Sequence, residues 1–164
     1  MSSPFDYEYE TIRVAEVAPR VAHLQLNRRG DLNAITETML VELSDAVDAL
    51  GRNDEVQVLV LSGSGTRAFS VGAAVRGRLE HLDMETAVDL SRRGQRAFAR
   101  VRRFPGPVIA SIEGYCLGGG MELAACADLR IAAPEATFGQ PELELGLVPG
   151  WGGTQRLGQL IGTS

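Results

Sequence analysis

The sequence predicts an α/β fold with a βαβ-type sheet and helical cover, and two observations lead to this class. Short apolar runs with the length of strands alternate with longer segments whose apolar residues recur at helical spacing. This alternation is typical of βαβ units. The chain has 164 residues, 45% of them hydrophobic, which suits one domain with a substantial core. We therefore expect residues 1–164 to form a single unit.

The first third of the chain predicts two strands and a helix. Residues 9–17 alternate loosely, and residues 21–27 alternate clearly between apolar and polar side chains, so we expect two paired strands. His23 lies on the polar side of this alternation, which favours a solvated strand residue over a ligand. Thr36 suits a helix N-cap, and an apolar stripe follows it to Gly51, which ends the helix.

The middle of the chain predicts a buried strand, a ligand loop and a second helix. Residues 56–61 are a continuous apolar run, which indicates a strand buried on both faces. The loop after it, 62–74, follows the carboxyl end of that strand, where open α/β sheets bind ligands. A helix is expected over 84–103. Its arginines indicate a solvated face, with phosphate binding as the less favoured alternative.

The stretch Gly114–Asp128 organises the rest of the chain. A strand expected over 108–112 leads to the glycine run 118–120, which opens a segment with helical spacing, followed by a short strand at 129–132. Glycine lets a backbone approach a ligand closely, and the first amides of a helix are unpaired at the positive end of its dipole. Glu122 in the first turn would place a carboxylate beside this anion site, which is a catalytic pattern. A tight turn with an acidic residue that only complements the dipole explains the same residues equally well.

Composition excludes several classes of protein. Sixteen basic and 21 acidic residues give a net charge of -5, which disfavours nucleic acid as a partner. No apolar run is long enough to cross a membrane, and the first residues lack the form of a signal peptide. Cys116 and Cys126 lie in apolar contexts, and we expect reduced core thiols in a cytoplasmic protein. No His and Cys cluster has ligand spacing, so no metal or redox cofactor is expected.

Three ordered segments resemble the enoyl-CoA hydratase/isomerase (crotonase) family. They are Ala68–Ala73 (AFSVGA), Gly114–Asp128 (GYCLGGGMELAACAD) and Phe138–Leu157 (FGQPELELGLVPGWGGTQRL). Asn27–Arg28 and Asn33–Ala34 also match an early signature of the family. The matches keep the family's order and cover nearly the whole chain, which makes them far more specific than one glycine-rich loop.

The resemblance implies a spiral of ββα turns, with two roughly perpendicular sheets and surrounding helices, that binds an acyl-CoA thioester. Members of the family continue into a C-terminal helical region that closes the acyl pocket and builds the trimer, and this sequence stops before it. We therefore expect the catalytic core of a longer protein, or a natural truncation. The full-length protein is expected to be a homo-oligomer, either a trimer or a dimer of trimers.

The resemblance also implies residue roles in the reversible hydration of 2-enoyl-CoA to 3-hydroxyacyl-CoA, a carbon–oxygen lyase reaction of fatty acid metabolism. Backbone N–H groups of Ala73 and Gly119 would form an oxyanion hole. Glu122 would activate water and protonated Glu142 would deliver the α-proton, with the reverse assignment left open; Glu144 is expected to be structural or exposed. The expected substrate contacts are Arg28, Val71, Gly72, Ala73, Ala74, Gly118 and Gly119.

Two departures from the family pattern keep alternatives open. Ala74 stands where the family usually has aspartate, which bears on loop geometry and substrate choice. Arg29 stands where a proline is usual. An isomerase or a specialised dehydratase is the second enzymatic interpretation, although the presence of both glutamates favours a hydratase. A non-catalytic acyl-CoA-binding subunit, suggested by Ala74 and by the missing C-terminal region, is the alternative from another class.

Overall fold

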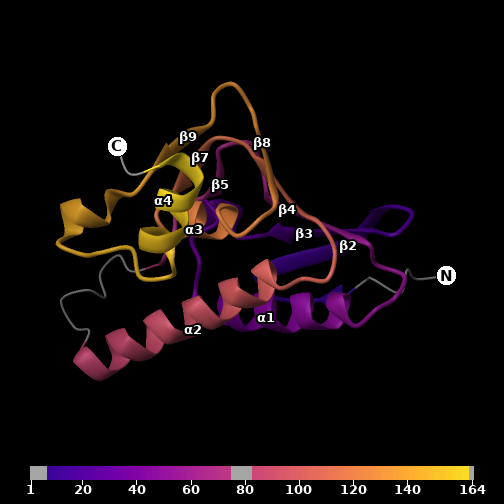
Figure 1. The fold of residues 1–164 in the computed structure, drawn as a ribbon, viewed down its shortest axis with the longest axis horizontal. Coiled ribbons are helices and arrows are strands. Elements are labelled where there is room, and N and C mark those ends of the chain that lie inside the picture. The colour runs from indigo at the N-terminus through magenta and orange to yellow at the C-terminus, as the bar shows by residue number, and fades with distance from the viewer. Residues whose placement is uncertain (1–6, 75–82, 163–164) are drawn as a thin grey trace.

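The computed structural model describes residues 7–74 and 83–162. Within them, one sheet has six strands in the order β1-β2-β3-β4-β6-β8, and a second has three in the order β5-β7-β9 (Figure 1). The elements, in chain order, are β1 (Tyr7–Glu8), β2 (Ile12–Ala18), β3 (Val21–Leu26), η1 (Arg29–Asp31), α1 (Glu37–Gly51), β4 (Val58–Gly63), β5 (Ala68–Ser70), α2 (Met84–Arg102), β6 (Val108–Ile112), β7 (Tyr115–Leu117), α3 (Gly119–Ala124), β8 (Leu129–Ala132), β9 (Thr137–Gly139), η3 (Pro141–Leu145) and α4 (Gly153–Ile161).

The chain winds as a spiral of ββα turns. In each turn one strand joins the six-stranded sheet, the next joins the three-stranded sheet, and a helix follows: β4-β5-α2, then β6-β7-α3, then β8-β9-η3. Consecutive turns pair in parallel, with Leu61 opposite Ala110 in the large sheet and Cys116 opposite Phe138 in the small one. The α/β class and the spiral with two sheets are therefore confirmed.

Helices α1 and α2 run together along one side of the large sheet and close the core there (Figure 1). Helix α1 begins at Thr36, whose Oγ1 accepts the N–H of Met39 at 3.1 Å, a cap that stabilises a helix by about 1 kcal/mol. The expected apolar stripe is buried, and Gly51 is the last helical residue. The expected hairpin is also confirmed, because β2 and β3 pair antiparallel.

The expectation that residues 56–61 form a strand buried on both faces is wrong. The strand is β4, shifted to Val58–Gly63, and only Leu59 and Leu61 are fully buried. Val58, Val60 and Ser62 are half-buried because they point away from the two helices. A run of valine and leucine therefore reflects one buried face and one partly open face.

The strands of the small sheet lie in segments that the residue pattern assigned to loops or to the glycine turn. Each has three residues: β5 lies within the loop expected at 62–74, β7 lies just before the glycine run 118–120, and β9 lies at Thr137–Gly139, where no strand was expected. Three residues are too few to show the alternation by which a strand is recognised. The strand expected over 9–17 is β2, which runs from Ile12 to Ala18, and a two-residue strand that was not expected, β1, precedes it at Tyr7–Glu8.

No helix in the described ranges combines the length and the apolar character that crossing a membrane requires.

Candidate active site

A cavity of about 200 Å³ lies where the three strands of the small sheet end. Parallel strands deliver the residues that follow them to one edge of a sheet. Ala73 follows β5, Gly119 follows β7 and Glu142 follows β9, and all three line this cavity together with Glu122. The remaining lining is formed by Val71, Ala87, Leu90, Ser91, Gly118, Pro141, Leu145, Leu147, Val148, Gly150 and Trp151. Both sequence-predicted glutamates and both predicted N–H donors thus meet at one place.

The N–H groups of Ala73 and Gly119 are available to a ligand. Ile35 forms a parallel bridge with Ala73 by donating to Gly72 O (2.8 Å) and accepting from Ala74 N (2.9 Å). In this pattern the N–H of Ala73 itself points away from Ile35. Gly119 is the first residue of α3, where an N–H has no partner inside the helix. Among the described residues neither N–H has an acceptor, and a Cβ placed on Gly119 would lie 3.4 Å from Ala73 N. Two free donors therefore lie close together.

The backbone conformation of Gly118 favours glycine, and the side chain of Glu142 lies against it. Its φ of 51° and ψ of −126° are conformations that other residues rarely adopt. A Cβ there would also lie 2.9 Å from Oε1 of Glu142. This close approach brings the Glu142 carboxyl group against the start of α3, so the glycine run both turns the chain and makes room for a functional side chain.

Glu122 is buried, with 2% of its surface exposed, yet its Oε1 accepts two backbone hydrogen bonds. The donors are Trp151 N at 2.9 Å and Gly153 N at 2.6 Å, the latter at the positive end of α4. Burial raises the pKa of Glu122, and the nearby charge of Glu142 raises it further. The two N–H bonds and the charge of Arg156 oppose these effects.

Glu142 lies in η3 and is half-buried. Burial raises the pKa of Glu142, while a hydrogen bond from its own backbone N–H opposes the rise. The pair therefore consists of one buried carboxylate held by two backbone donors and one half-buried carboxyl group that the side-chain amide of Gln140 approaches at 2.8 and 2.9 Å. Glu144 is exposed and does not line the cavity, as the sequence indicated.

Trp151 was not singled out from the sequence, although it forms one wall of the cavity. Its ring is packed edge-on against Phe98, with ring centroids 5.3 Å apart and an interplanar angle of 80°. A Cβ on Gly94 would lie 2.2 Å from Trp151 Nε1, and one on Gly119 would lie 2.5 Å from Cζ3. The sequence contains one signal for this packing: Gly94 lies inside the predicted helix 84–103, and a glycine in a helix often marks the close approach of another element.

Three of the expected substrate contacts do not line the cavity. Gly72 and Ala74 hydrogen-bond to Ile35 behind it. The guanidinium of Arg28 donates to Ala34 O at 2.8 Å and pairs with Asp31, so it is held within its own loop. Their contact with substrate stays a prediction.

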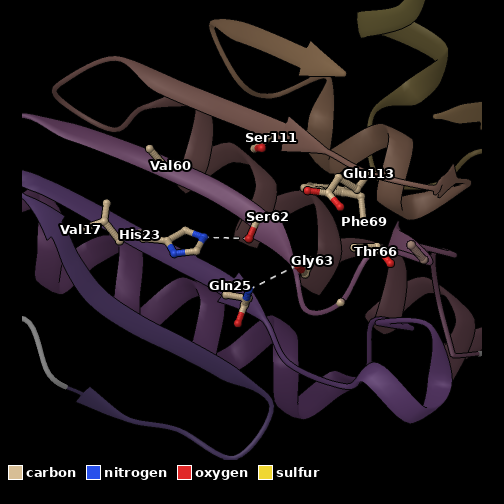
Figure 2. Close-up of a pocket in the computed structure, with 12 residues that line it drawn as sticks. Val17, His23, Gln25, Val60, Ser62, Gly63, Thr66, Phe69, Ser111 and Glu113 are labelled. Atoms are coloured by element: carbon tan, nitrogen blue, oxygen red, sulfur yellow. Dashed lines mark hydrogen bonds between the residues drawn. The ribbon is translucent and has the colours of Figure 1, made fainter. Parts of the chain in front are cut away.

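A second cavity, of about 510 Å³, opens on the half-buried face of the large sheet (Figure 2), and neither Glu122 nor Glu142 lines it. His23 and Ser62 point toward each other there, with Nε2 and Oγ 2.7 Å apart, and Glu113 lies farther along the groove (Figure 2). His23 is thus half-buried and hydrogen-bonded, and not simply solvated as expected. Burial lowers the pKa of His23, which favours the neutral imidazole. The smaller cavity, where both predicted glutamates and the two unpaired N–H groups converge, is therefore the candidate active site.

The cysteines and the possible metal ligands add no further reactive cluster in the described ranges. Cys116 and Cys126 are buried free thiols, and burial raises their pKa values to about 12 and about 11. They are core residues, as the sequence indicated. Nowhere in residues 7–74 and 83–162 do three His, Cys, Asp or Glu side chains gather as metal ligands would.

Comparison with known proteins assigns this geometry to a family. Residues 16–164 match the family model described as enoyl-CoA hydratase/isomerase. The chain is 42% identical over 154 residues to a crotonyl-CoA hydratase of Syntrophomonas wolfei, covering 94% of this chain and 58% of the relative. It is 36% identical to a short-chain-enoyl-CoA hydratase of Clostridium acetobutylicum, covering 91% of this chain and 57% of that protein.

A solved structure gives the same result. The enoyl-CoA hydratase from Bacillus anthracis superposes with a TM-score of 0.90 at 35% sequence identity, covering 94% of this chain and 60% of that one. The sequence therefore spans less than two thirds of the length of these relatives. The fold, the three ordered segments and the match over residues 16–164 agree, and the chain belongs to the enoyl-CoA hydratase/isomerase family.

Proposed function

We propose that this protein hydrates a 2-enoyl-CoA thioester to the 3-hydroxyacyl-CoA, reversibly. One observation carries the proposal: two carboxyl groups and two unpaired backbone N–H groups line the same small cavity. Addition of water to a conjugated double bond needs a base for the water, an acid for the α-carbon and a site for the negative charge on the thioester oxygen. The cavity contains a candidate for each.

The N–H groups of Ala73 and Gly119 act as the oxyanion hole in this proposal. They donate to the thioester oxygen as it becomes enolate-like, and donors of this kind contribute about 3 kcal/mol each in other enzymes. Because both are backbone groups on the edge of the small sheet, they are fixed before substrate arrives. Val71 and Gly118 flank them along the cavity wall.

Glu122 acts on water and Glu142 acts on carbon. The two backbone donors on Oε1 favour the ionised form of Glu122, and among the described residues its Oε2 accepts no hydrogen bond from protein. This carboxylate takes a proton from water as the new C–O bond forms at C3. Glu142, whose pKa burial raises, gives its proton to C2. The reverse reaction returns both protons and releases water.

The apolar wall of the cavity supports a short acyl chain. Leu90, Leu145, Leu147 and Val148 line it beside the glutamates. Two relatives are named crotonyl-CoA hydratase and short-chain-enoyl-CoA hydratase, and these names also favour a short acyl chain. Coenzyme A enters as part of the substrate, and no other cofactor takes part in the proposed scheme. Arg28, Gly72 and Ala74 are proposed to lie along the coenzyme A side of the site.

We further propose that the full-length protein is a cytoplasmic homo-oligomer, a trimer or a dimer of trimers. Its support is a set of exposed apolar side chains in η3, in the loop after it and in α4, which subunit contacts or further chain would cover: Leu143, Leu145, Val148, Leu160 and Ile161. The two free buried thiols suit a reducing compartment. Light scattering of the full-length protein and cell fractionation test the two statements.

The direct test is hydration of crotonyl-CoA by the purified protein, followed by the loss of the conjugated enoyl absorbance. Glu122→Gln and Glu142→Gln should each lower kcat by about 100- to 10,000-fold, the range for loss of a general acid or base. Glu144→Gln removes an exposed neighbouring carboxylate and should leave kcat within about twofold. Normal turnover in Glu142→Gln would refute the scheme, and coenzyme A binding without any turnover by the wild type would favour a non-catalytic acyl-CoA binder.

A further inference from the structure

Arg156 makes a specific contact with the loop that precedes its own helix. It lies in α4 and is half-buried, and its Nη1 donates to Trp151 O at 2.7 Å. Gly152, between the two, has a φ of 112°, and a Cβ there would lie 1.9 Å from Nη1 of Arg156. The guanidinium therefore rests against the bare backbone of Gly152, in a space that only glycine leaves free.

The same loop holds Glu122 from its other side. The N–H groups of Trp151 and Gly153 donate to Glu122 Oε1, while the carbonyl of Trp151 accepts from Arg156. Two of the three loop residues are glycines, which have the greatest backbone freedom. A link from α4 to the Trp151 carbonyl removes that freedom and fixes the direction of both N–H donors.

Arg156 also balances the charges around Glu122. Among the described residues, the titratable groups that face Glu122 are Glu142 from η3, Arg156 from α4 and the thiol of Cys126 just after α3. Arg156 is the cation in this set. Burial and Glu142 both disfavour the ionised form of Glu122, and Arg156 opposes them without lining the cavity.

We propose that Arg156 is a positioning residue that orients Glu122 through the Trp151–Gly153 loop and, as the nearby cation, favours the carboxylate form that takes a proton from water. The inference rests on the proposed hydration, in which Glu122 accepts the proton from water. Arg156 does not touch substrate in this arrangement. Its removal should therefore affect turnover and its pH dependence, and leave substrate binding nearly unchanged.

The kinetic test compares Arg156→Gln with Arg156→Lys and with Arg92→Gln, which removes an exposed arginine of α2. Arg156→Gln should lower kcat about 10- to 100-fold with KM within about twofold, and should move the acid limb of the kcat/KM profile to higher pH. Arg156→Lys keeps the charge and should restore the acid limb, with only part of kcat. Arg92→Gln should match the wild type. An unshifted acid limb in Arg156→Gln would overturn the proposal.

A second readout does not need activity. Trp151 is the only tryptophan in the sequence, its backbone N–H donates to Glu122, and both residues line the same cavity, so its fluorescence should change as Glu122 takes up a proton. This transition should disappear in Glu122→Gln, persist in Glu142→Gln, and move to higher pH in Arg156→Gln but not in Arg156→Lys. If the wild type is inactive, the proposed function fails and the titration alone decides the role of Arg156. Identical titrations for wild type and Arg156→Gln would refute that role. If Arg156→Gln does not fold, Arg156→Lys takes its place in the test, and a shifted transition in Arg156→Lys would refute the role.

Discussion

Replacement of Gly94 by alanine should destabilise the protein, although alanine is the better helix former. Gly94 lies inside α2 and is buried beneath the ring of Trp151. A Cβ at this position would lie 2.2, 2.3 and 2.4 Å from three atoms of that ring, closer than any real contact. The ring cannot simply turn away, because Phe98 is packed against it and the backbone of Trp151 holds Glu122.

Two opposing effects set the magnitude. Alanine in place of glycine in a helix interior stabilises by about 1 kcal/mol. Forcing an extra methyl group into a packed core costs about 1–3 kcal/mol, and three overlaps with a rigid indole place Gly94→Ala near 3. The free energy of unfolding should therefore fall by about 2 kcal/mol. Turnover should fall as well, because a displaced Trp151 moves the N–H donor from Glu122.

Urea unfolding of a double-mutant cycle separates the two effects. In a Trp151→Leu background the overlap is absent, so Gly94→Ala should raise the free energy of unfolding by about 1 kcal/mol. The sign of the effect of Gly94→Ala thus reverses with the residue at position 151, with a coupling of about 3 kcal/mol. A stabilising effect of Gly94→Ala in both backgrounds would refute the packing argument.

Three further predictions concern the core, a helix end and pH. Asn33→Ala should lower the free energy of unfolding, measured by urea titration, by about 3 kcal/mol, because it leaves buried loop partners unpaired and places alanine at a φ of 55°. The control Asn53→Ala loses one exposed hydrogen bond and should lower the free energy of unfolding by only about 0.5 kcal/mol. Thr36→Ala removes the cap of α1 and should cost about 1 kcal/mol, and an unchanged midpoint would argue against the cap. The folded-state pKa of Glu122 is raised, so its contribution to stability is present below the unfolded-state pKa, about 4.3, and is lost as pH rises through the folded-state pKa. Glu122→Gln should remove that loss. In thermal unfolding between pH 4 and pH 8, the melting temperature of the variant should therefore rise relative to that of the wild type as the pH increases.

The sequence predicts best the elements whose signal is local. Helix α1 has a cap at Thr36 and a buried stripe in register with 3.6 residues per turn, and it lies where expected. Strand β6 at Val108–Ile112 matches its predicted bounds. In β4 the residue pattern cannot distinguish one buried face from two, because half-buried valines read like core residues.

The residues of the candidate site likewise fall into those that the sequence located and those whose contacts only the structure shows. Resemblance located Glu122, Glu142, Ala73 and Gly119, and the structure places all four around one cavity. The packing of Trp151 against α2 depends on which helix lies beside which loop, and no local pattern encodes that, because Gly94 and Trp151 are far apart in the sequence. The hydrogen bond from Arg156 to Trp151 is local, but it ends on a backbone carbonyl, and a pattern of side chains does not reveal such a partner.

The geometry of the small sheet explains why the least predictable strands position the residues of the proposed site. A strand that only has to aim the residue after it at a ligand needs few residues, and β5, β7 and β9 have three each. Their parallel pairing, continued by the hydrogen bond from Gly118 N to Gly139 O at 2.9 Å, fixes the spacing between the chain ends that follow them. Ala73, Gly119 and Glu142 thus reach the cavity from three successive turns of the spiral. Since the large sheet and its two helices supply most of the core, residues after the short strands can vary with substrate while the fold is retained.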